Sequence, residues 1–496
     1  MAYNSINTYD ARSVIPEFKG LLQYGDTINA DPRYATDAEN METIGGTLQP
    51  AAKCQVLTPE LDHPIETLAR LYRRWYTGAD EKEILIAASA GQLYYMLPSA
   101  DAWTLLALPV AWPDTEYSSN VWSWVAYEIN PEGSESPVDV LLMSNALDGM
   151  IMIRGDNYSV ATVTTPKKFG VIERYAERIW GGAIIDDPDM LVYSAPFDPT
   201  DWAADTEIPE DGAGDISQPS WDGDSFTALR AFGSQLIAFK KNRVWRILGT
   251  DPGEYTFKEQ FGGGSPYFNT IAVDSERIFL LDKTGVMVYD GLTVQAFYQA
   301  FAKEIFSRMN QAFLDQSCAV LWHGKYYCAF PLDTSETNNA VLIYSTDDNT
   351  WLLRTDVSVE SFLAAEDNLY FTSTATPGQI WLWAENSWET EEATTDDTIW
   401  TSPWNDLGYK NYTKSNFDVY FTVECIGTAQ ITFSLETEKK VKTKTYSGVG
   451  TDAEAKQKRM HFGGSGRRFR LIIESTGGAL WRIVGGILIV SEIDPD

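Results

Sequence analysis

The sequence predicts an all-β protein in which a β-propeller of about seven blades lies between an extended N-terminal arm and a C-terminal antiparallel β-sandwich. Three observations support this class. Apolar runs separated by Gly, Asn, Asp or Ser corners recur along most of the chain, with 42 to 57 residues between the starts of successive units. The chain holds 17 Trp, 25 Tyr and 22 Phe, which favour strands and contact surfaces. From about residue 398 the short runs give way to longer alternating ones.

Residues 1–55 are predicted to form the arm. Gly, Pro, Asn and Asp recur every few residues in this part of the chain, as in GDTINADPRYATDAENMETIGGTLQP. Such residues interrupt regular structure. We therefore expect an extended segment that lies on another part of the protein.

Residues 56–397 are predicted to form the propeller. Its units are expected to start near Leu68, Trp122, Ile172, Leu229, Ile271, Ala319 and Phe362. Tight corners are expected at Ala90-Gly91, Gly233-Ser234, Asp274-Ser275, His323-Gly324 and Glu366-Asp367-Asn368, because such residues allow a strand to reverse within two or three positions. VLIYSTDDNTWLLRT (341–355) is then the outer hairpin of one blade. One helix is expected, between two blades, where apolar residues of FAKEIFSRMNQAF (301–313) fit a helical face.

Residues 398–496 are predicted to form the sandwich from four or five longer alternating strands. This part holds 13 Lys/Arg and 11 Asp/Glu, so the first 397 residues hold the remaining 25 of 38 basic and 59 of 70 acidic residues. The acidity therefore belongs to the arm and propeller, whereas the C-terminal part is close to neutral. This asymmetry indicates that the two parts face different surroundings.

The composition argues against several function classes. A formal net charge of −32 disfavours tight binding of nucleic acid or of anionic membranes, since both depend on clustered Lys and Arg. We find no signal peptide and no apolar run long enough to span a membrane. The four cysteines are scattered, which favours reduced, buried thiols over a zinc site or a disulfide framework.

No residue is predicted to be catalytic or to bind a cofactor or metal, and we expect no enzyme activity. Only three His are present, each isolated in sequence. FGGGSP (261–266) lacks the Lys-Ser/Thr of a phosphate-binding loop. Carboxylate pairs such as Asp186-Asp187, Asp347-Asp348 and Asp396-Asp397 show by adjacency alone nothing of the facing pair that a glycosidase needs.

STDDNTW (345–351) resembles the Asp-box corner of sialidase propellers. Ser345, Asp347 and Trp351 occur in the required order, but Asn349 replaces the glycine and Trp351 arrives one place early. The motif occurs once, whereas sialidases repeat it. A turn is therefore the preferred interpretation.

The C-terminal part carries a candidate contact surface for another subunit or partner. It consists of Lys439, Lys440, Lys442, Lys444, Arg467, Arg468 and Arg470. A solvated strand face or loop is the first interpretation of these residues. Because the propeller of a second copy is strongly acidic, a subunit contact is the second interpretation.

Three parts of the chain carry a family resemblance. Residues 17–53 form an arm that leads into Gly-x-Leu-x-Pro, residues 190–207, 229–252 and 276–291 form a succession of propeller strands, and residues 463–475 and 481–490 belong to the C-terminal sandwich. Together they resemble the tail hub or nozzle proteins of short-tailed bacteriophages, also called packaged-DNA stabilisation proteins.

The resemblance implies a non-enzymatic structural protein of the virion tail, made in the host cytoplasm. It implies a homohexameric ring below the portal or adaptor ring that closes the tail channel, retains packaged DNA and passes it during ejection without binding it specifically. It assigns no gate loop or lumen residue. The chemistry of the sequence leaves two rivals open, a carbohydrate-binding or carbohydrate-active propeller and a phage receptor-binding protein.

Overall fold

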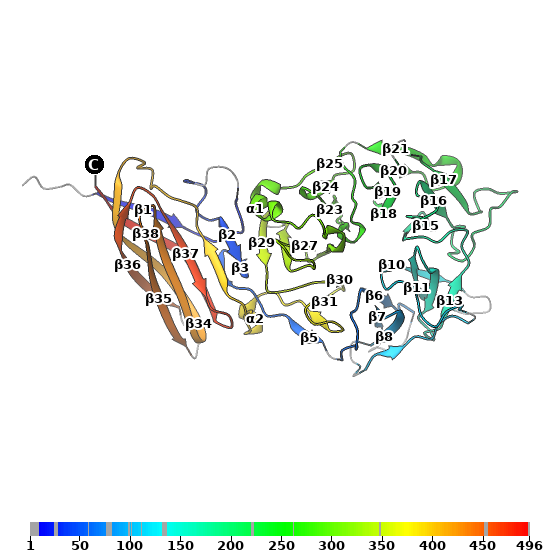
Figure 1. The fold of residues 1–496 in the computed structure, drawn as a ribbon, viewed down its shortest axis with the longest axis horizontal. Coiled ribbons are helices and arrows are strands. Elements are labelled where there is room, and N and C mark those ends of the chain that lie inside the picture. The colour runs from blue at the N-terminus through cyan, green and yellow to red at the C-terminus, as the bar shows by residue number, and fades with distance from the viewer. Residues whose placement is uncertain are drawn as a thin grey trace, which may run out of the picture.

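The computed structural model describes residues 9–494 except 24–27, 58, 76–81, 98–99, 101, 111, 131–135, 220–222, 261, 347–348 and 451–454. The described chain is almost entirely β and forms two lobes, a propeller and a sandwich-like C-terminal lobe (Figure 1). The predicted fold class is therefore confirmed. No helix of the described residues is long and apolar enough to cross a membrane.

Five blades follow one another along the chain as four-stranded antiparallel meanders. They are β6 (Thr67–Tyr72), β7 (Glu83–Ser89), β8 (Gln92–Met96) and β9 (Thr104–Leu105); β10 (Ser123–Ile129), β11 (Val138–Asn145), β12 (Gly149–Arg154) and β13 (Val160–Val163); β14 (Val171–Tyr175), β15 (Arg178–Gly182), β16 (Met190–Tyr193) and β17 (Gly214–Ser217); β18 (Phe226–Phe232), β19 (Gln235–Lys240), β20 (Val244–Leu248) and β21 (Thr256–Gln260); and β22 (Ala272–Val273), β23 (Ile278–Asp282), β24 (Gly285–Tyr289) and β25 (Val294–Ala296).

The last blade is closed by the N-terminal part of the chain. It consists of β30 (Ser361–Ala364), β31 (Leu369–Thr372) and β32 (Ile380–Leu382), and its fourth strand is β5 (Gln55–Leu57). β5 pairs with β32 in the register Val56 to Trp381. The pairing joins the start and the end of the ring.

The blade count differs from the prediction in one respect. Six blades are separate sheets, whereas about seven were expected. The remaining unit, β26 (Cys318–Trp322), β27 (Lys325–Phe330), β28 (Ala340–Ser345) and β29 (Thr350–Arg354), is also a four-stranded meander. It is continuous with a 14-stranded sheet because Leu353 of β29 bridges Glu39 of β2 (Asp37–Glu39) in parallel.

Apolar layers between neighbouring units close the ring. Each unit packs its buried face on the next, and the layer formed by Leu68, Leu85, Leu363 and Ile380 joins the last blade to the first. The seven positions predicted to start the units lie in, or one residue before, the first strand of each. The repeat length read from the sequence therefore matches the spacing between the innermost strands of successive units.

The expected hairpin at residues 341–355 is present as β28 and β29, the outer two strands of their unit. Asp347 and Asp348 lie outside the described residues. The expected helix is shorter than predicted: α1 spans Lys303–Ser307 and follows a 3-10 turn at Gln299–Ala302, between β25 and β26. A second short helix, α2 (Ser387–Thr390), precedes the C-terminal lobe. All four cysteines are buried and none forms a disulfide.

The C-terminal lobe has two antiparallel layers that share one strand. Its strands are β33 (Thr398–Thr401), β34 (Thr413–Thr437), β35 (Val441–Gly450), β36 (Lys456–Gly466), β37 (Phe469–Ser475) and β38 (Leu480–Asp494). The first half of β34 pairs with β36 and β38, and the second half with β35 and β37. The change occurs at Gly427, whose φ of 71° is accessible to glycine without strain. Phe417 and Phe469 meet across the layers, with ring centroids 5.0 Å apart.

The arm lies on the C-terminal lobe. β1 (Tyr9–Ile15) pairs along β38, and the hairpin of β3 (Met41–Ile44) and β4 (Thr47–Pro50) also adjoins β38. β2 lies between β29 of the propeller and β33 of the C-terminal lobe. The arm therefore connects the two lobes through backbone hydrogen bonds as well as through the chain itself.

Candidate functional site

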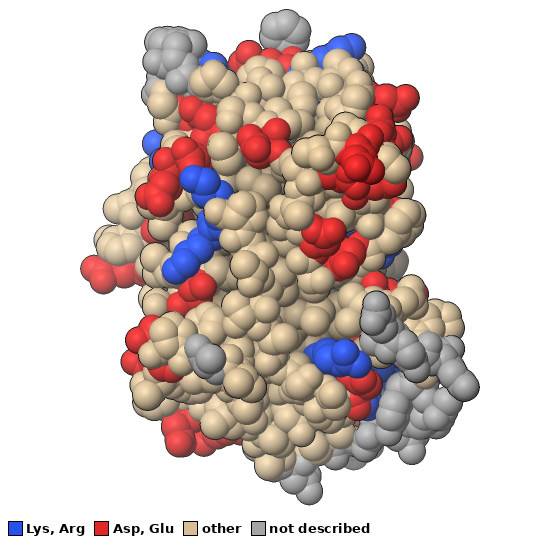
Figure 2. Space-filling model, turned by 90° about the vertical axis from the view of Figure 1, so that its right-hand side faces the viewer, with Lys and Arg blue, Asp and Glu red and all other residues tan. Residues whose placement is uncertain are grey.

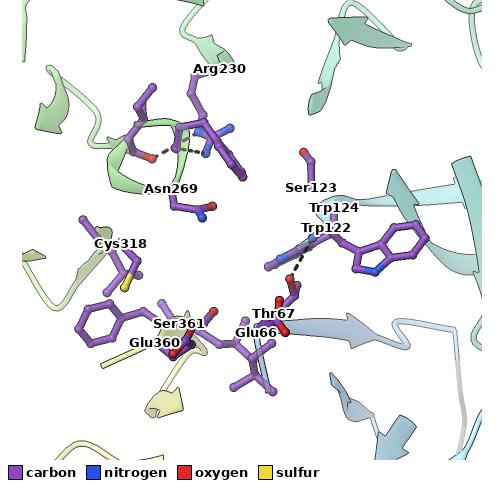
Figure 3. Close-up of a pocket in the computed structure, with 18 of the residues that line it drawn as sticks. Glu66, Thr67, Trp122, Ser123, Trp124, Arg230, Asn269, Cys318, Glu360 and Ser361 are labelled. Carbon is purple, nitrogen blue, oxygen red and sulfur yellow. Dashed lines mark hydrogen bonds between the residues drawn. The ribbon is translucent and has the colours of Figure 1, made fainter. Parts of the chain in front are cut away.

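A cavity of about 320 Å³ lies on the propeller axis, where the innermost strands converge (Figure 3). Its lining comes from β6, β10, β14, β18, β26, β30 and the segment leading into β22. Pockets with convergent polar groups are the usual place for a ligand. The cavity is therefore the first candidate for a ligand-binding site.

An ion pair spans one side of the cavity. The Arg230 guanidinium lies 3.8 Å from the Glu173 carboxylate and donates hydrogen bonds to the main-chain carbonyls of Leu229, at 2.8 Å, and Ile271, at 3.4 Å. Burial raises the pKa of Glu173 to about 7, against the opposing effect of Arg230. Burial also lowers the pKa of Arg230. These groups link β14, β18 and the start of the next blade.

Two further carboxylates line the opposite side. Burial, with a contribution from the nearby Glu66, raises the pKa of Glu360. Glu66 accepts a hydrogen bond of 3.0 Å from the Asn120 side chain. The cavity thus holds three carboxylates and one guanidinium and has an acidic character.

The nucleophilic side chains at the cavity are occupied or inert. The Ser123 hydroxyl accepts from the Ile172 amide at 3.0 Å and donates to the Ile172 carbonyl at 3.4 Å, which ties two blades together. Burial raises the pKa of the Cys318 thiol well above its ordinary value. Among the described residues no group of His, Cys, Asp or Glu is arranged to hold a metal ion. The geometry supports a structural role for these side chains.

A buried charge network occupies the junction of arm and propeller. Arg354 forms two hydrogen bonds of 2.6 Å with Asp356 and donates to the Ala52 carbonyl at 2.9 Å. Glu42 of the arm lies 3.8 Å from Arg354 and accepts from the Ala52 amide. Burial pushes the pKa of Asp356 up, but Arg354 brings it below its ordinary value. Burial raises the pKa of Glu42.

The seven predicted contact residues separate into two groups. Lys439, Lys440, Lys442 and Lys444 are exposed on the turn after β34 and on β35. Arg468 and Arg470 instead pair with Glu438, at 3.6 Å, and Glu436, at 2.6 Å, and both guanidinium groups lie 5.0 Å from the Trp404 ring. The Arg467 amide donates to Glu438. The lysines are therefore available to a partner, whereas Arg468 and Arg470 are engaged within the lobe.

Sequence reasoning missed the junction network and the axial ion pair. Glu42 and Arg354 are 312 positions apart in the sequence, and nothing local indicates that they meet. Glu173 and Arg230 occupy equivalent positions in the inner strands of consecutive units, so the repeat itself carried a signal that they lie side by side.

The closed ring of four-stranded units defines a β-propeller protein extended by a two-layered C-terminal lobe. No protein-family model matches the chain, and no curated protein matches it. Among solved structures it is similar to the Neurospora crassa Pan2 WD40 domain, with 11% identity over 65% of this chain and 90% of that chain and a TM-score of 0.34. It is also similar to a chain in the crystal structure of BBS1N in complex with ARL6DN, soaked with lead, with 10% identity over 67% of this chain and 97% of that chain and a TM-score of 0.39. Neither similarity supports a conclusion about the function of this chain.

Proposed function

We propose that the protein is a structural component of a bacteriophage tail, a hub or nozzle subunit that works by architecture rather than by catalysis. Six copies form a ring next to the portal or adaptor ring. The ring closes the tail channel, retains the packaged DNA and lets it pass during ejection. The proposal is based on the resemblance of the sequence to tail hub and nozzle proteins.

The observation that carries the proposal is the distribution of charge. The first 397 residues hold 59 acidic and 25 basic residues. At the end of the propeller that faces away from the C-terminal lobe, Asp and Glu gather in several places and Lys and Arg are sparse (Figure 2). Where subunit contacts leave this acidic surface uncovered, it repels phosphates, so DNA slides past it instead of binding.

DNA passage requires space between copies. The axial cavity of one propeller, at about 320 Å³, is far too small for a duplex, and the Glu173–Arg230 pair crosses its wall. A channel for DNA must therefore be enclosed by several subunits, which agrees with a ring.

The junction suits a subunit that withstands internal pressure. β2 pairs on one side with the propeller and on the other with the C-terminal lobe, and a single apolar core extends from Phe279 and Tyr326 of the propeller to Phe433 of β34. Close-packed interiors transmit force with little compression. The two lobes are therefore suited to act as one rigid body.

Electron microscopy of the purified chain, alone and mixed with the portal and adaptor proteins of its virion, tests the proposal. Class averages with six-fold symmetry and a central hole are the expected result. Lone particles in both samples would contradict it. In that case a glycan array and a glycoside panel would examine the carbohydrate-propeller rival, and binding to host cells would examine the receptor-binding rival.

A further inference from the structure

The two edge strands of the C-terminal lobe direct lysines toward each other. Lys442 and Lys444 of β35 stand opposite the core residues Leu435 and Phe433 of β34. Directly opposed residues of an antiparallel pair share a face. Both lysines therefore point to the inner side of their layer.

The same holds for the other layer. Lys456 and Lys458 of β36 stand opposite Val423 and Phe421 of β34, both of which are buried. The Lys458 ammonium lies 5.6 Å from the Tyr446 ring of β35, so the two edges are close there. The four lysines together line the open side of the two-layered lobe, and we name this surface the lysine mouth.

The charge of the lysine mouth is not compensated by the described residues. Lys442, Lys444, Lys456 and Lys458 make no ion pair with any carboxylate of the described part of the chain. β35 is exposed on both faces from Val441 to Thr445, and Val441 and Val449 are 54% and 72% exposed. Lysines on an edge strand oppose the addition of another strand. A partner for this edge is therefore an acidic surface rather than a pairing strand.

An acidic surface lies at the other end of the same chain. The connection from β16 to β17 exposes six carboxylates and contains no Lys or Arg; they are Asp198, Asp201, Asp205, Glu207, Glu210 and Asp211. We name this segment, residues 197–211, the acidic loop. Two of its apolar side chains are also exposed, Phe197 at 73% and Ile208 at 51%. Apolar side chains rimmed by charges are typical of protein contact sites.

The acidic loop has a defined shape. The buried Arg178 side chain donates to the carbonyls of Ser194, at 2.8 Å, and Gly212, at 2.7 Å, and to that of Glu210. Asp205 accepts from the amides of Glu207 and Ile208, which lowers the pKa of its carboxyl. Because hydrogen bonds to its backbone fix the loop, its outer carboxylates can meet a partner without an ordering step on binding.

The two surfaces lie at opposite ends of an elongated molecule. β35 and β36 belong to one lobe, and β16 and β17, which the acidic loop joins, lie at the far end of the other (Figure 1). They cannot meet within one chain. Two different surfaces that fit each other make a head-to-tail contact, and repetition of such a contact gives a ring when its rotation closes.

We propose that the lysine mouth of one copy binds the acidic loop of the next. This inference rests on the proposed function, because it names the contact by which the ring forms. Phe197 and Ile208 then cover the apolar parts of the β35 edge, while the carboxylates face the four lysines. The carboxylates of Glu207, Glu210 and Asp211 accept no hydrogen bond from the described residues and are available for this contact.

Charge reversal at each end tests the contact. The self-association of the purified chain is measured by analytical ultracentrifugation at low and high salt. We expect Lys442→Glu/Lys444→Glu and Glu207→Lys/Asp211→Lys each to weaken association at least about tenfold, since like charges then oppose each other. We expect an equimolar mixture of the two variants to associate as the unaltered chain does, because each restores the opposite charge for the other.

The matched control is Lys283→Glu/Lys303→Glu, which makes the same change of charge at two exposed lysines of the propeller. It should leave association unchanged. The contact is wrong if the unaltered chain stays monomeric at low salt, if the control weakens association equally, or if the mixture fails to restore it. Six-fold rings formed with the virion neighbours by the charge-reversed variants would overturn this contact and leave the proposed function standing.

Discussion

At the scale of single residues, Arg354 is the side chain on which the junction most depends. It is 2% exposed and compensates two buried carboxylates, Asp356 at 2.6 Å and Glu42 at 3.8 Å. Removal of one partner from a buried charge network costs about 3–5 kcal/mol, because charge is left unpaired in the interior. We therefore expect Arg354→Ala to lower the free energy of unfolding by about this amount, as measured by chemical denaturation.

Arg308 provides the comparison. It pairs with Asp333 at 2.8 Å, but the two side chains are 43% and 53% exposed. Exposed pairs contribute about 0–1 kcal/mol. If Arg354→Ala lowers the free energy of unfolding by no more than Arg308→Ala does, the junction network does not stabilise the fold.

Glu173 makes the stability of the propeller depend on pH. Burial raises the pKa of this carboxyl from 4.5 to about 7. The folded protein thus holds this proton more tightly than the unfolded chain, so the contribution of Glu173 to stability is complete below pH 4.5 and is lost as the pH rises through about 7. We expect this contribution to be of order 1–3 kcal/mol. Glu173→Gln should remove it, so the difference in unfolding free energy between variant and parent should change between pH 5 and 8. A constant difference would contradict the assignment.

At the scale of elements, the corner between β7 and β8 is a two-residue turn with left-handed backbone at both positions, φ 50° at Ala90 and 70° at Gly91. Asn tolerates this region better than Ala. We expect Ala90→Asn to raise stability by about 1 kcal/mol, because Asn adopts left-handed backbone at a lower cost than Ala. Gly91→Ala should lower it, because a Cβ there would lie 2.9 Å from the Tyr117 carbonyl oxygen. Both shifts are measurable as thermal midpoints, and shifts in the opposite directions would refute the turn geometry.

The corners and inner strands were predictable because their causes are local. Gly, Asn and Asp at reversals and apolar alternation in between repeat in every unit, so Leu68, Leu229 and Phe362 could be placed on equivalent strands. The pairing of β1 with β38 was not predictable, since Tyr9 and Ile493 are brought together only by the folded lobe. The expected helix was too long for a related reason: Phe301 lies in the preceding 3-10 turn, and Met309, after the helix, bridges Leu332 in an antiparallel contact that the sequence does not indicate.

The candidate contact residues also include some that the structure leaves exposed and some that pair within the lobe. Lys442 and Lys444 stood out by composition, and their exposure agrees with a contact surface. Arg468 and Arg470 stood out equally, yet Glu436 lies opposite Arg470 on β34, and Glu438 lies beside Arg468 in the turn that follows β34. Cross-strand pairing decides which basic residues are available to a partner. The sequence alone does not show this pairing, because it does not show the strand register.

At the scale of the whole molecule, the two lobes share one core. The largest buried apolar cluster includes Phe279 of the propeller, Phe18 of the arm and Phe433 of the C-terminal lobe. Phe18 packs edge-on against Trp400 of β33, with ring centroids 5.2 Å apart. Residues in one contiguous core lose their contacts together, which makes unfolding cooperative. The lobes should therefore not melt separately, although each is large enough to form a domain of its own.

Differential scanning calorimetry tests this coupling. We expect a single transition whose calorimetric and van't Hoff enthalpies agree, as for a two-state unit. Phe18→Ala should leave a cavity where the arm meets β33 and separate the transition into two. Phe169→Ala, in the apolar layer between the β10–β13 and β14–β17 blades and remote from the junction, should lower the midpoint of a single transition. Two transitions in the unaltered chain would mean that the arm holds the lobes together without making them one cooperative body, and the ring subunit that we propose would then bend at the junction under load.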